Sequence, residues 1–324
     1  MKQVFRTQQG IKVVDVQIPS INENEVLVKV HRSMISTGTE TMTLRKEQVS
    51  LSNKLKTHKK NLDKLKKMVL AEGFGKSYKF IKYKLKPSPD DIDLSPIGYS
   101  NSGVIVATGS KVMNFNIGDR VACAGSGIAA HAEYVAVPRN LVVAIPENVT
   151  FEQAAFTTIG SIAIQGLRRA NVTFGDTIVI TGLGLIGLLS VQIAKAWGLT
   201  VIALDIDDSR IALAKQLGAD YAYNAILTEL DSIIKSLTSG NGADAVVICA
   251  ATKSNAPVNQ AMHLCRRKGT VTIVGSVGMN VERDQMYLKE IDLLMSTSYG
   301  PGRYDDQYEK AGIDYPIGYV KWTE

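Results

Sequence analysis

The chain has 324 residues, of which 45% are hydrophobic and 21% are charged. That length suits two domains of the usual ~100–200 residues, and the composition is that of a globular protein. No stretch reaches the ~18 uninterrupted apolar residues that a membrane span needs, and the first residues lack the apolar core of a signal peptide. We therefore exclude a membrane-spanning protein and expect a cytoplasmic one. Three cysteines, Cys123, Cys249 and Cys265, form no Cys-x-x-Cys pair, and we expect them to be reduced and buried.

The first half of the chain is predicted to be rich in β-strands. Apolar and polar residues alternate in short stretches at 12–16 and 26–30, and further strands are expected at 120–122 and 132–137. Between these strands, apolar residues at three- and four-residue spacing from 51 to 69, separated by lysines, predict an amphipathic helix.

Beyond residue 152 the pattern changes to alternating strands and helices. Apolar strands are expected at 177–181, 200–204, 244–249 and 269–274, and helices at 185–197, 209–217 and 256–264. Such alternation predicts a parallel sheet covered by helices on both faces. The fold class is therefore α/β, with a β-rich first domain and a doubly wound second domain.

A glycine-rich turn follows the first strand of the second domain. Gly182, Gly184 and Gly187 fit the pattern G-x-G-x-x-G, and Leu185 and Ile186 open the helix that follows. In this context the first glycine allows a tight turn, the second lets backbone N–H groups approach a pyrophosphate, and the third lets the helix pack closely on the strand. The turn predicts a dinucleotide cofactor; the alternative is a packing turn in a domain that binds no nucleotide.

The end of the next strand indicates which dinucleotide is bound. Asp205 is expected to accept hydrogen bonds from both hydroxyls of the adenosine ribose, and its charge would repel a 2′-phosphate. We therefore expect NAD(H) rather than NADP(H). Arg210 could reach the ribose or lie on an exposed helix, and we favour the second. Ala250, Gly275 and Ser276 end later strands and are expected to meet the nicotinamide; the alternative for them is a plain strand-to-helix turn.

Several stretches together resemble a known family over nearly the whole chain. They are the strand at 26–30, GDRV at 118–121, AEYVAVP at 132–138, IPENVTFEQAA at 145–155 and the glycine turn. These are similar to the medium-chain dehydrogenase/reductase family, the zinc alcohol dehydrogenase superfamily. ISTGTE at 35–40, GYS at 98–100 and KEIDLLMSTSYGPGRYD at 289–305 further resemble bacterial bi-domain oxidoreductases associated with polysaccharide biosynthesis, in which such a unit precedes a Gfo/Idh/MocA-type oxidoreductase.

The resemblance implies a domain organisation. A GroES-like catalytic domain is expected at 1–155 with a basic helical insertion at about 45–86, followed by a Rossmann NAD(P)-binding domain at 156–298. Residues 299–324 would begin the return to the catalytic domain, where the chain stops short of the proteins it resembles. We expect it to be truncated or the product of a split gene. The resemblance also implies a homodimer and a Gfo/Idh/MocA-type partner domain or chain.

The positions that would hold catalytic zinc in the family carry other residues here. Tyr99 and Ser100 replace the His and Glu of a Gly-His-Glu motif, Ser36 stands where the first cysteine ligand is expected, and Thr158 approximately where the third is expected. Zinc needs imidazole, thiolate or carboxylate ligands. No cysteine precedes Cys123, so the four-cysteine structural zinc site is missing too. We predict no metal at either position.

The basic segment lies roughly where that structural lobe would be. It contains 14 Lys and Arg but only 3 Asp and Glu, a net charge of +11, so the rest of the chain carries −5. It is either a solvated helical insertion or a source of positive field for an anionic substrate, such as a nucleotide-linked sugar, or an acidic partner. A membrane-surface helix is a third alternative. Nucleic-acid binding is not expected, because its aromatic residues lie only at its end and it has no recognisable reading motif.

Hydride transfer without zinc requires another group to move the proton and stabilise the oxyanion. Tyr99 is the first candidate, with Ser36 and Thr37 as hydrogen-bond donors; alternatively, Tyr99 packs under the cofactor and does no chemistry. His31 is the one histidine worth testing, although a structural role is the simpler interpretation. We expect a zinc-independent, NAD-linked oxidoreductase acting on a sugar or another polyhydroxylated small molecule, with reduction slightly favoured. The alternatives are an enone or quinone reductase of the same fold and a non-catalytic cofactor-binding unit of a larger assembly.

Overall fold

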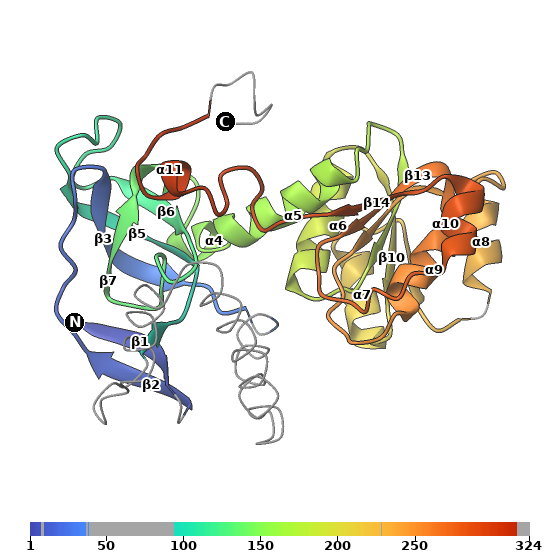
Figure 1. Cartoon of the computed structure of the whole chain (residues 1–324), viewed down its shortest axis with the longest axis horizontal. Helices are drawn as coiled ribbons and strands as arrows, with labels where there is room; N and C mark the ends of the chain where they lie inside the picture. The colour runs from blue at the N-terminus through green and yellow to red at the C-terminus, as the bar shows by residue number, and fades with distance from the viewer. Residues whose placement is uncertain (8–9, 37, 39–93, 228, 316–324) are drawn as a thin grey trace, which may run out of the picture.

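The computed structural model describes residues 1–7, 10–36, 38, 94–227 and 229–315. These residues form a β-rich lobe and an α/β lobe, and helix α5 (Thr157–Arg169) runs from one to the other (Figure 1). The basic segment 45–86, the helix expected at 51–69 and Thr37 lie outside the described residues. Within the described part of the chain, no helix is both long and apolar enough to cross a membrane.

The β-rich lobe contains two antiparallel sheets. One has the order β2-β1-β4 and the other the order β7-β3-β5-β6-β8. In β3, Val26 and Val28 are fully buried while Lys29 is exposed, as the alternating sequence predicts. The bounds are β1 Lys2–Thr7, β2 Gly10–Asp15, β3 Glu25–Ser33, β4 Ser95–Pro96, β5 Ser100–Thr108, β6 Arg120–Ala124, β7 Tyr134–Pro138, β8 Val142–Ala144, the short helix η2 Arg139–Leu141 and α4 Phe151–Ala154.

The α/β lobe is a parallel sheet of six strands in the order β11-β10-β9-β12-β13-β14. This is the doubly wound order in which the first strand lies at the centre and the chain reverses direction beside it. The strands are β9 Thr177–Thr181, β10 Thr200–Asp205, β11 Tyr221–Asn224, β12 Ala243–Ile248, β13 Cys265–Ile273 and β14 Asp292–Met295. A nucleotide in such a sheet binds at the carboxyl ends of the strands where the order reverses, here between β9 and β12.

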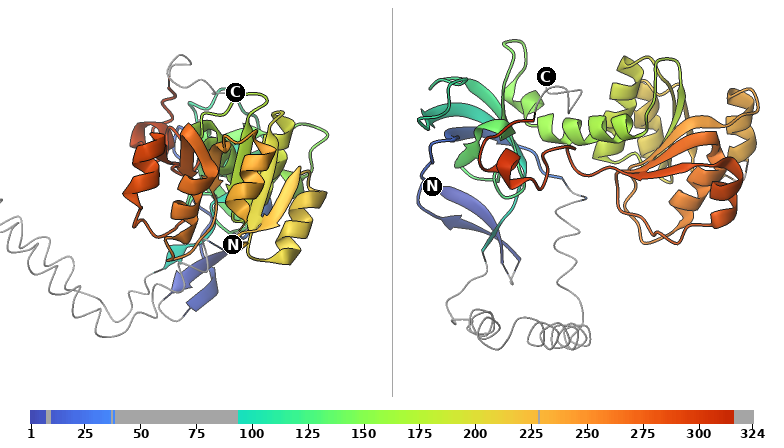
Figure 2. Two further views of the ribbon diagram at one scale, coloured as in Figure 1. Left: turned by 90° about the vertical axis from the view of Figure 1, so that its right-hand side faces the viewer. Right: turned by 45° about the horizontal axis from the view of Figure 1, so that its top comes forward.

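Helices cover both faces of this sheet. Apolar residues of α5, α6 (Leu185–Ala196) and α7 (Asp208–Gln216) pack on one face. Those of α8 (Leu230–Leu237), α9 (Ala256–Leu264) and α10 (Arg283–Lys289) pack on the other. The three layers can be followed in Figure 2. Because both faces are covered, the strands are continuous apolar runs rather than alternating ones.

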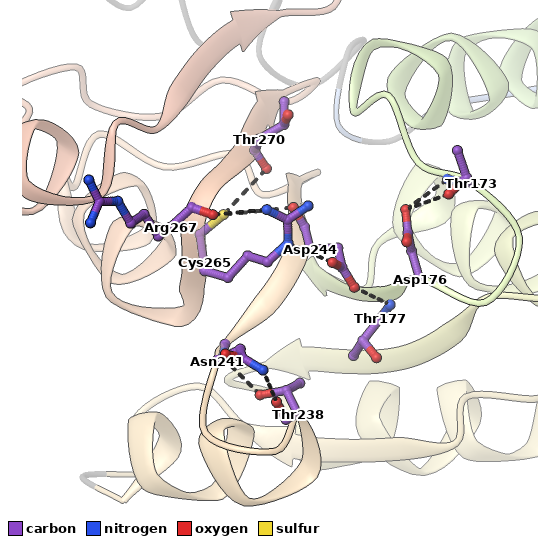
Figure 3. Close-up of polar contacts among 11 residues, drawn as sticks. Thr173, Asp176, Thr177, Thr238, Asn241, Asp244, Cys265, Arg267 and Thr270 are labelled. Atoms are coloured by element: carbon purple, nitrogen blue, oxygen red, sulfur yellow. Dashed lines mark hydrogen bonds and ion pairs between the residues drawn. The ribbon is translucent and has the colours of Figure 1, made fainter.

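The amino ends of three neighbouring strands are fixed by one carboxylate. Asp244 of β12 accepts a hydrogen bond of 2.8 Å from the backbone N–H of Thr177 in β9, as Figure 3 shows. Its other oxygen lies 2.6 Å from Nε of Arg266 in β13. This buttress lies at the edge opposite the carboxyl ends and has a structural role.

After β14 the chain returns to the β-rich lobe (Figure 1). Gly300 passes so close to α5 that a Cβ there would lie 2.7 Å from Oε1 of Gln165. Helix α11 (Asp306–Glu309) follows, and the guanidinium of Arg139 donates to the carbonyl of Gly312 at 3.0 and 2.6 Å. This segment, residues 299–315, therefore contacts both the connecting helix and the β-rich lobe.

The α/β fold class with a β-rich first lobe is confirmed. The strands expected at 177–181, 200–204 and 244–249 match β9, β10 and β12 to within one residue, and the helix expected at 256–264 is α9. Strand β13 begins at Cys265 rather than at residue 269. The sequence patterns did not identify α5, β11, α8, α10 or β14.

Candidate active site

The three glycines of the turn have three different environments. Gly182 has φ +91°, and a Cβ on it would lie 2.5 Å from the backbone nitrogen of Ala250. A Cβ on Gly187 would lie 2.0 Å from the carbonyl oxygen of Gly182, so the helix can pack this closely only without a side chain. Around Gly184, by contrast, no described atom lies within 4 Å of the Cβ position. The space at the second glycine is where a pyrophosphate has to approach the backbone.

Helix α6 presents its amino end to that space. Gly184 is its N-cap residue, and among the described residues no side chain caps it and no acidic side chain lies in its first turn. The backbone N–H groups of Leu185, Ile186 and Gly187 belong to the part of a helix that has no partner within the helix itself. Together with the partial positive charge of the helix end, they suit a phosphate group.

Asp205 lies at the end of β10, beside the turn, and is only 6% exposed. One carboxylate oxygen accepts a hydrogen bond of 2.6 Å from the N–H of Leu183. The other accepts from the N–H groups of Ile206 at 2.8 Å and Asp207 at 3.0 Å. A carboxylate has about four acceptor positions, so roughly one remains for a ribose hydroxyl. Asp205 therefore also holds the glycine turn in place, a role that its position in the sequence did not reveal.

Arg210 lies next to this carboxylate. Its guanidinium is 3.7 Å from Asp205 and 3.6 Å from Asp207, and the side chain is 52% exposed. Hydrogen bonds from Ser209, together with Arg210, lower the pKa of Asp207. Arg210 is therefore exposed, as expected, but its contact with Asp205 also agrees with the alternative that it reaches the ribose.

The other predicted cofactor residues meet the turn. Ala250 follows β12 directly, and a Cβ on Gly275 would lie 2.1 Å from the carbonyl oxygen of Ala250. The N–H of Ser276 donates to the same carbonyl at 3.0 Å. Gly182, which follows the neighbouring strand β9, also lies against the backbone of Ala250. The ends of β9, β12 and β13 therefore meet backbone to backbone.

Tyr99 and Ser36 belong to one corner of the β-rich lobe. Strand β3 ends opposite the start of β5, where Ser33 pairs with Asn101, and the N–H of Met34 donates to the carbonyl of Ser100 at 3.0 Å. Tyr99 is half-buried and Ser36 is 7% exposed. The two segments that carry the predicted catalytic residues therefore lie side by side, while Thr37 is outside the described residues.

The hydroxyl groups at the expected zinc positions are bonded to the backbone. Ser100 is fully buried, and its Oγ donates to the carbonyl of Ala155 at 2.6 Å. Thr158 is 3% exposed, and its Oγ1 donates to the carbonyl of Cys123 at 3.2 Å. Neutral hydroxyls that donate their protons in this way are poor zinc ligands. The described residues at these positions therefore do not fit a zinc ion.

Two further groups considered from the sequence have structural surroundings. The ring of His31 is exposed and stacks on Phe151, with 4.4 Å between the centroids. Burial raises the pKa of each cysteine thiol, at Cys123, Cys249 and Cys265, to about 12. All three are free thiols that remain protonated at neutral pH, so they are neither nucleophiles nor ready metal ligands.

A cavity of about 230 Å³ lies beside Thr158. Its lining includes Thr158 and Ser161 of α5, together with Tyr299, Tyr308 and Tyr315 of the returning segment. Neither the glycine turn nor Asp205 lines it. Sequence reasoning missed the three tyrosines, because they lie some 140 residues from α5 along the chain and only the return of residues 299–315 brings them there.

Comparison with known proteins agrees with this architecture. Residues 186–311 match the family model described as zinc-binding dehydrogenase, and residues 75–147 match that of the alcohol dehydrogenase GroES-like domain. A sorbitol dehydrogenase of Halalkalibacterium halodurans is 30% identical over 243 residues, which are 64% of this chain and 70% of that protein. An erythritol/L-threitol dehydrogenase of Mycolicibacterium smegmatis is 35% identical over 170 residues, 51% of this chain and 46% of that protein.

The solved structure of 2R,3R-butanediol dehydrogenase from Bacillus subtilis superposes with a TM-score of 0.69 at 21% identity, covering 93% of this chain and 85% of that one. The two-lobed fold, with its open parallel sheet and glycine turn, is that of a medium-chain dehydrogenase/reductase. The chain belongs to the zinc-type alcohol dehydrogenase family, and it is an oxidoreductase of that family.

Proposed function

We propose that this chain uses NAD(H) to oxidise or reduce a sugar or another polyhydroxylated alcohol or ketone, without a zinc ion at the reacting oxygen. The observation that carries the cofactor half of the proposal is Asp205, a buried carboxylate bonded to the glycine turn at the end of β10. The nicotinamide group would supply or accept the hydride at its C4 carbon.

The charges beside the ribose position favour NAD(H) over NADP(H). Asp205 ends β10, Asp207 follows two residues later, and the guanidinium of Arg210 lies 3.7 and 3.6 Å from their carboxylates. A 2′-phosphate would add about −1.5 to −2 charges beside two carboxylates that share one cation. The 2′-hydroxyl can instead donate to the remaining acceptor position of Asp205.

The corner at Tyr99 supports proton transfer by a side chain rather than by a metal. A phenol hydroxyl can donate its proton. In the reduction of a ketone, the carbonyl carbon receives the hydride while Tyr99 gives its proton to the carbonyl oxygen and regains one from water. Ser36 is buried in the same corner and, with Thr37, is proposed to stabilise the developing oxyanion.

The class of substrate is proposed from the relatives and from the cavity. The relatives named for sorbitol and for erythritol and threitol act on linear polyols by their names, and the cavity beside Thr158 is lined by hydroxyl groups. A role in polysaccharide biosynthesis, a homodimer and a Gfo/Idh/MocA-type partner remain part of the proposal. An enone or quinone reductase would share the missing metal ligands, and the polyol names of the relatives favour the first candidate over it.

The test is calorimetric titration of the full chain with NADH and with NADPH, combined with elemental analysis for zinc. We expect NADH to bind at least tenfold more tightly than NADPH, with much less than one zinc per chain. Asp205→Ala should abolish the preference, and Asp208→Ala, a change at the exposed start of the following helix, serves as the matched control. Stoichiometric zinc, or tighter binding of NADPH, would contradict the proposal.

The proposed role of Tyr99 as proton donor is tested with a separate variant. In an assay of NADH oxidation with a panel of ketoses, Tyr99→Phe should lower kcat by ~10²–10⁴, the usual contribution of a positioned acid, and leave the affinity for NADH unchanged. Turnover at the wild-type rate would remove Tyr99 from the mechanism. Tight NADH binding by the wild type with no turnover of any ketose or polyol would favour the non-catalytic alternative.

A further inference from the structure

The cavity beside Thr158 is closed on one side by the segment that returns from the α/β lobe. Tyr299, Tyr308 and Tyr315 of this segment line it, opposite Thr158 and Ser161 of α5. A Cβ on Gly302 would lie 2.5 Å from the ring of Tyr308, so the turn between the tyrosines fits tightly around that ring. The wall is a built feature of the fold.

Tyr299 is held in one orientation by a buried ion pair. Its hydroxyl donates to the carboxylate of Glu309, which is 6% exposed, and Arg303 contacts both oxygens of that carboxylate at 2.7 and 3.0 Å. Burial and the Glu309 carboxylate raise the pKa of Tyr299, so the phenol is neutral. Because its proton is directed to Glu309, the Tyr299 oxygen can only accept further hydrogen bonds.

The other two tyrosines have committed their protons as well. The Tyr308 hydroxyl donates to the carbonyl of Asn140 at 3.4 Å, and the Tyr315 hydroxyl donates to Asp305 at 2.5 Å. Their rings are stacked, with 5.5 Å between the centroids and 13° between the planes. The pair adds apolar ring surface and two acceptor oxygens to the cavity wall.

The hydroxyl groups that line the cavity from α5 also donate their protons to backbone carbonyls. Thr158 donates to the carbonyl of Cys123 at 3.2 Å, and Ser161 donates to the carbonyl of Thr157 at 2.9 Å. With Thr157, whose hydroxyl donates to the carbonyl of Ala154 at 2.7 Å, six hydroxyl oxygens around the cavity offer lone pairs while their protons are used elsewhere. Two groups of opposite charge, Arg168 and Asp314, also line it, so the lining does not favour an anion or a cation.

We propose that this cavity binds one polyhydroxylated carbon unit, a polyol or single sugar residue, whose hydroxyls donate to these acceptor oxygens while its C–H surface packs on the stacked tyrosines. A quinone, or a ketone without hydroxyl groups, offers acceptors only and would supply these oxygens with no donor. The volume of about 230 Å³ lies below the ~300–1,000 Å³ of sites for drug-sized ligands, so any nucleotide attached to the sugar would extend outside. The inference rests on the proposed function in one respect: the bound unit would lie beside Thr158, at the edge of the candidate active site.

The test measures binding to the full chain by saturation-transfer NMR, with D-sorbitol and D-galactose as probes and n-hexanol as a ligand with a single hydroxyl. Ser161→Leu should fill the cavity and abolish binding of both probes, whereas Ser161→Ala, which removes one acceptor oxygen without adding bulk, should weaken it only about five- to tenfold. Tyr299→Phe should weaken binding roughly five- to tenfold, the loss of one hydrogen bond. Tyr304→Phe, at an exposed tyrosine on the other side of Arg303, is its control.

Titration with NADH in parallel separates the two proposals. Sugar binding that survives Ser161→Leu, or n-hexanol binding as tightly as sorbitol, overturns the inference. No binding of either sugar by a wild type that binds NADH normally also overturns it, and leaves the cofactor proposal standing. Sugar binding that is lost in Ser161→Leu, by a protein that binds neither NADH nor NADPH, supports the cavity site and refutes the proposed function.

Discussion

Two alanine substitutions in the glycine turn should both weaken cofactor binding, but only one of them should lower stability. In Gly187→Ala the new Cβ would lie 2.0 Å from the carbonyl oxygen of Gly182, so α6 has to move away from β9. Overpacking of this kind costs about 1–3 kcal/mol. At about 2–4 °C per kcal/mol for a domain of 150–250 residues, the melting temperature should fall by roughly 2–12 °C.

Gly184→Ala should leave the fold intact. The φ of Gly184 is −73°, which alanine adopts freely, and no described atom lies within 4 Å of the new Cβ. Alanine is worse than glycine at an N-cap by about 0.5–1 kcal/mol, and the reduced entropy of the unfolded chain offsets about 0.4–1 kcal/mol. The two terms nearly cancel, so the melting temperature should stay within about 2 °C. The methyl group nevertheless takes up the space where a pyrophosphate would meet the backbone.

The assay is a thermal melt of each variant, with calorimetric titration of NADH below the melting temperature. Gly184→Ala should weaken NADH binding at least tenfold at unchanged stability, whereas Gly187→Ala should lower both. The reasoning is refuted if Gly184→Ala binds NADH as tightly as the wild type, because the cofactor phosphates would then not lie against the turn. It is equally refuted if Gly187→Ala melts at the wild-type temperature.

Three further predictions concern burial. The pKa of each of the three thiols is raised to about 12, so a disulfide reagent at pH 8 should label none of them in the native protein and all three in urea. Labelling of a thiol in the native protein would contradict its burial. Ser100→Ala removes a buried hydrogen bond to Ala155 and should cost about 1–2 kcal/mol in a denaturant titration, so an unchanged midpoint would argue against that bond. The pKa of Tyr299 is raised in the folded state, so its contribution to stability is fully present below pH ~10 and is lost as the pH rises through the folded-state pKa. The free energy of unfolding of the wild type should therefore fall above pH ~10 more steeply than that of Tyr299→Phe. Parallel pH profiles of the two proteins would rule this out.

The four central strands of the α/β lobe, β10, β9, β12 and β13, could be predicted from local patterns because they are short apolar runs bounded by glycine or aspartate. The turn after β9 combines a strand, three glycines and a helix within a dozen residues, and the first acidic residue after the next strand lies in the expected place. Helix α5 could not be predicted in this way. It contains Gly160, Gly166 and two threonines, which weaken its intrinsic preference for a helix, and it is stabilised by packing against β6 and α6.

The candidate site, too, could be predicted only in part from the sequence. Positions read from motifs, such as Tyr99 and Asp205, lie where the sequence places them, but their hydrogen bonds were not foreseeable. The contact between Asp205 and the glycine turn joins residues 22 apart, and the cavity wall depends on a segment more than 130 residues from α5. Pairings of this kind are set by tertiary packing, about which local periodicity carries no information.

The corner at Tyr99 explains why the loss of metal ligands need not destabilise the fold. In a zinc site the ligands are thiolates, imidazoles or carboxylates, and a cluster of ionised ligands is stable only with its cation. Here Ser100 and Thr158 are neutral, and each gives its proton to a backbone carbonyl within the corner. These two buried hydroxyl groups are therefore satisfied without an ion. Restoring one ligand, as in Ser100→Glu, would place an unpaired carboxylate in a fully buried position and should destabilise the protein rather than recruit zinc, since a single carboxylate cannot complete the three protein ligands of a catalytic zinc site.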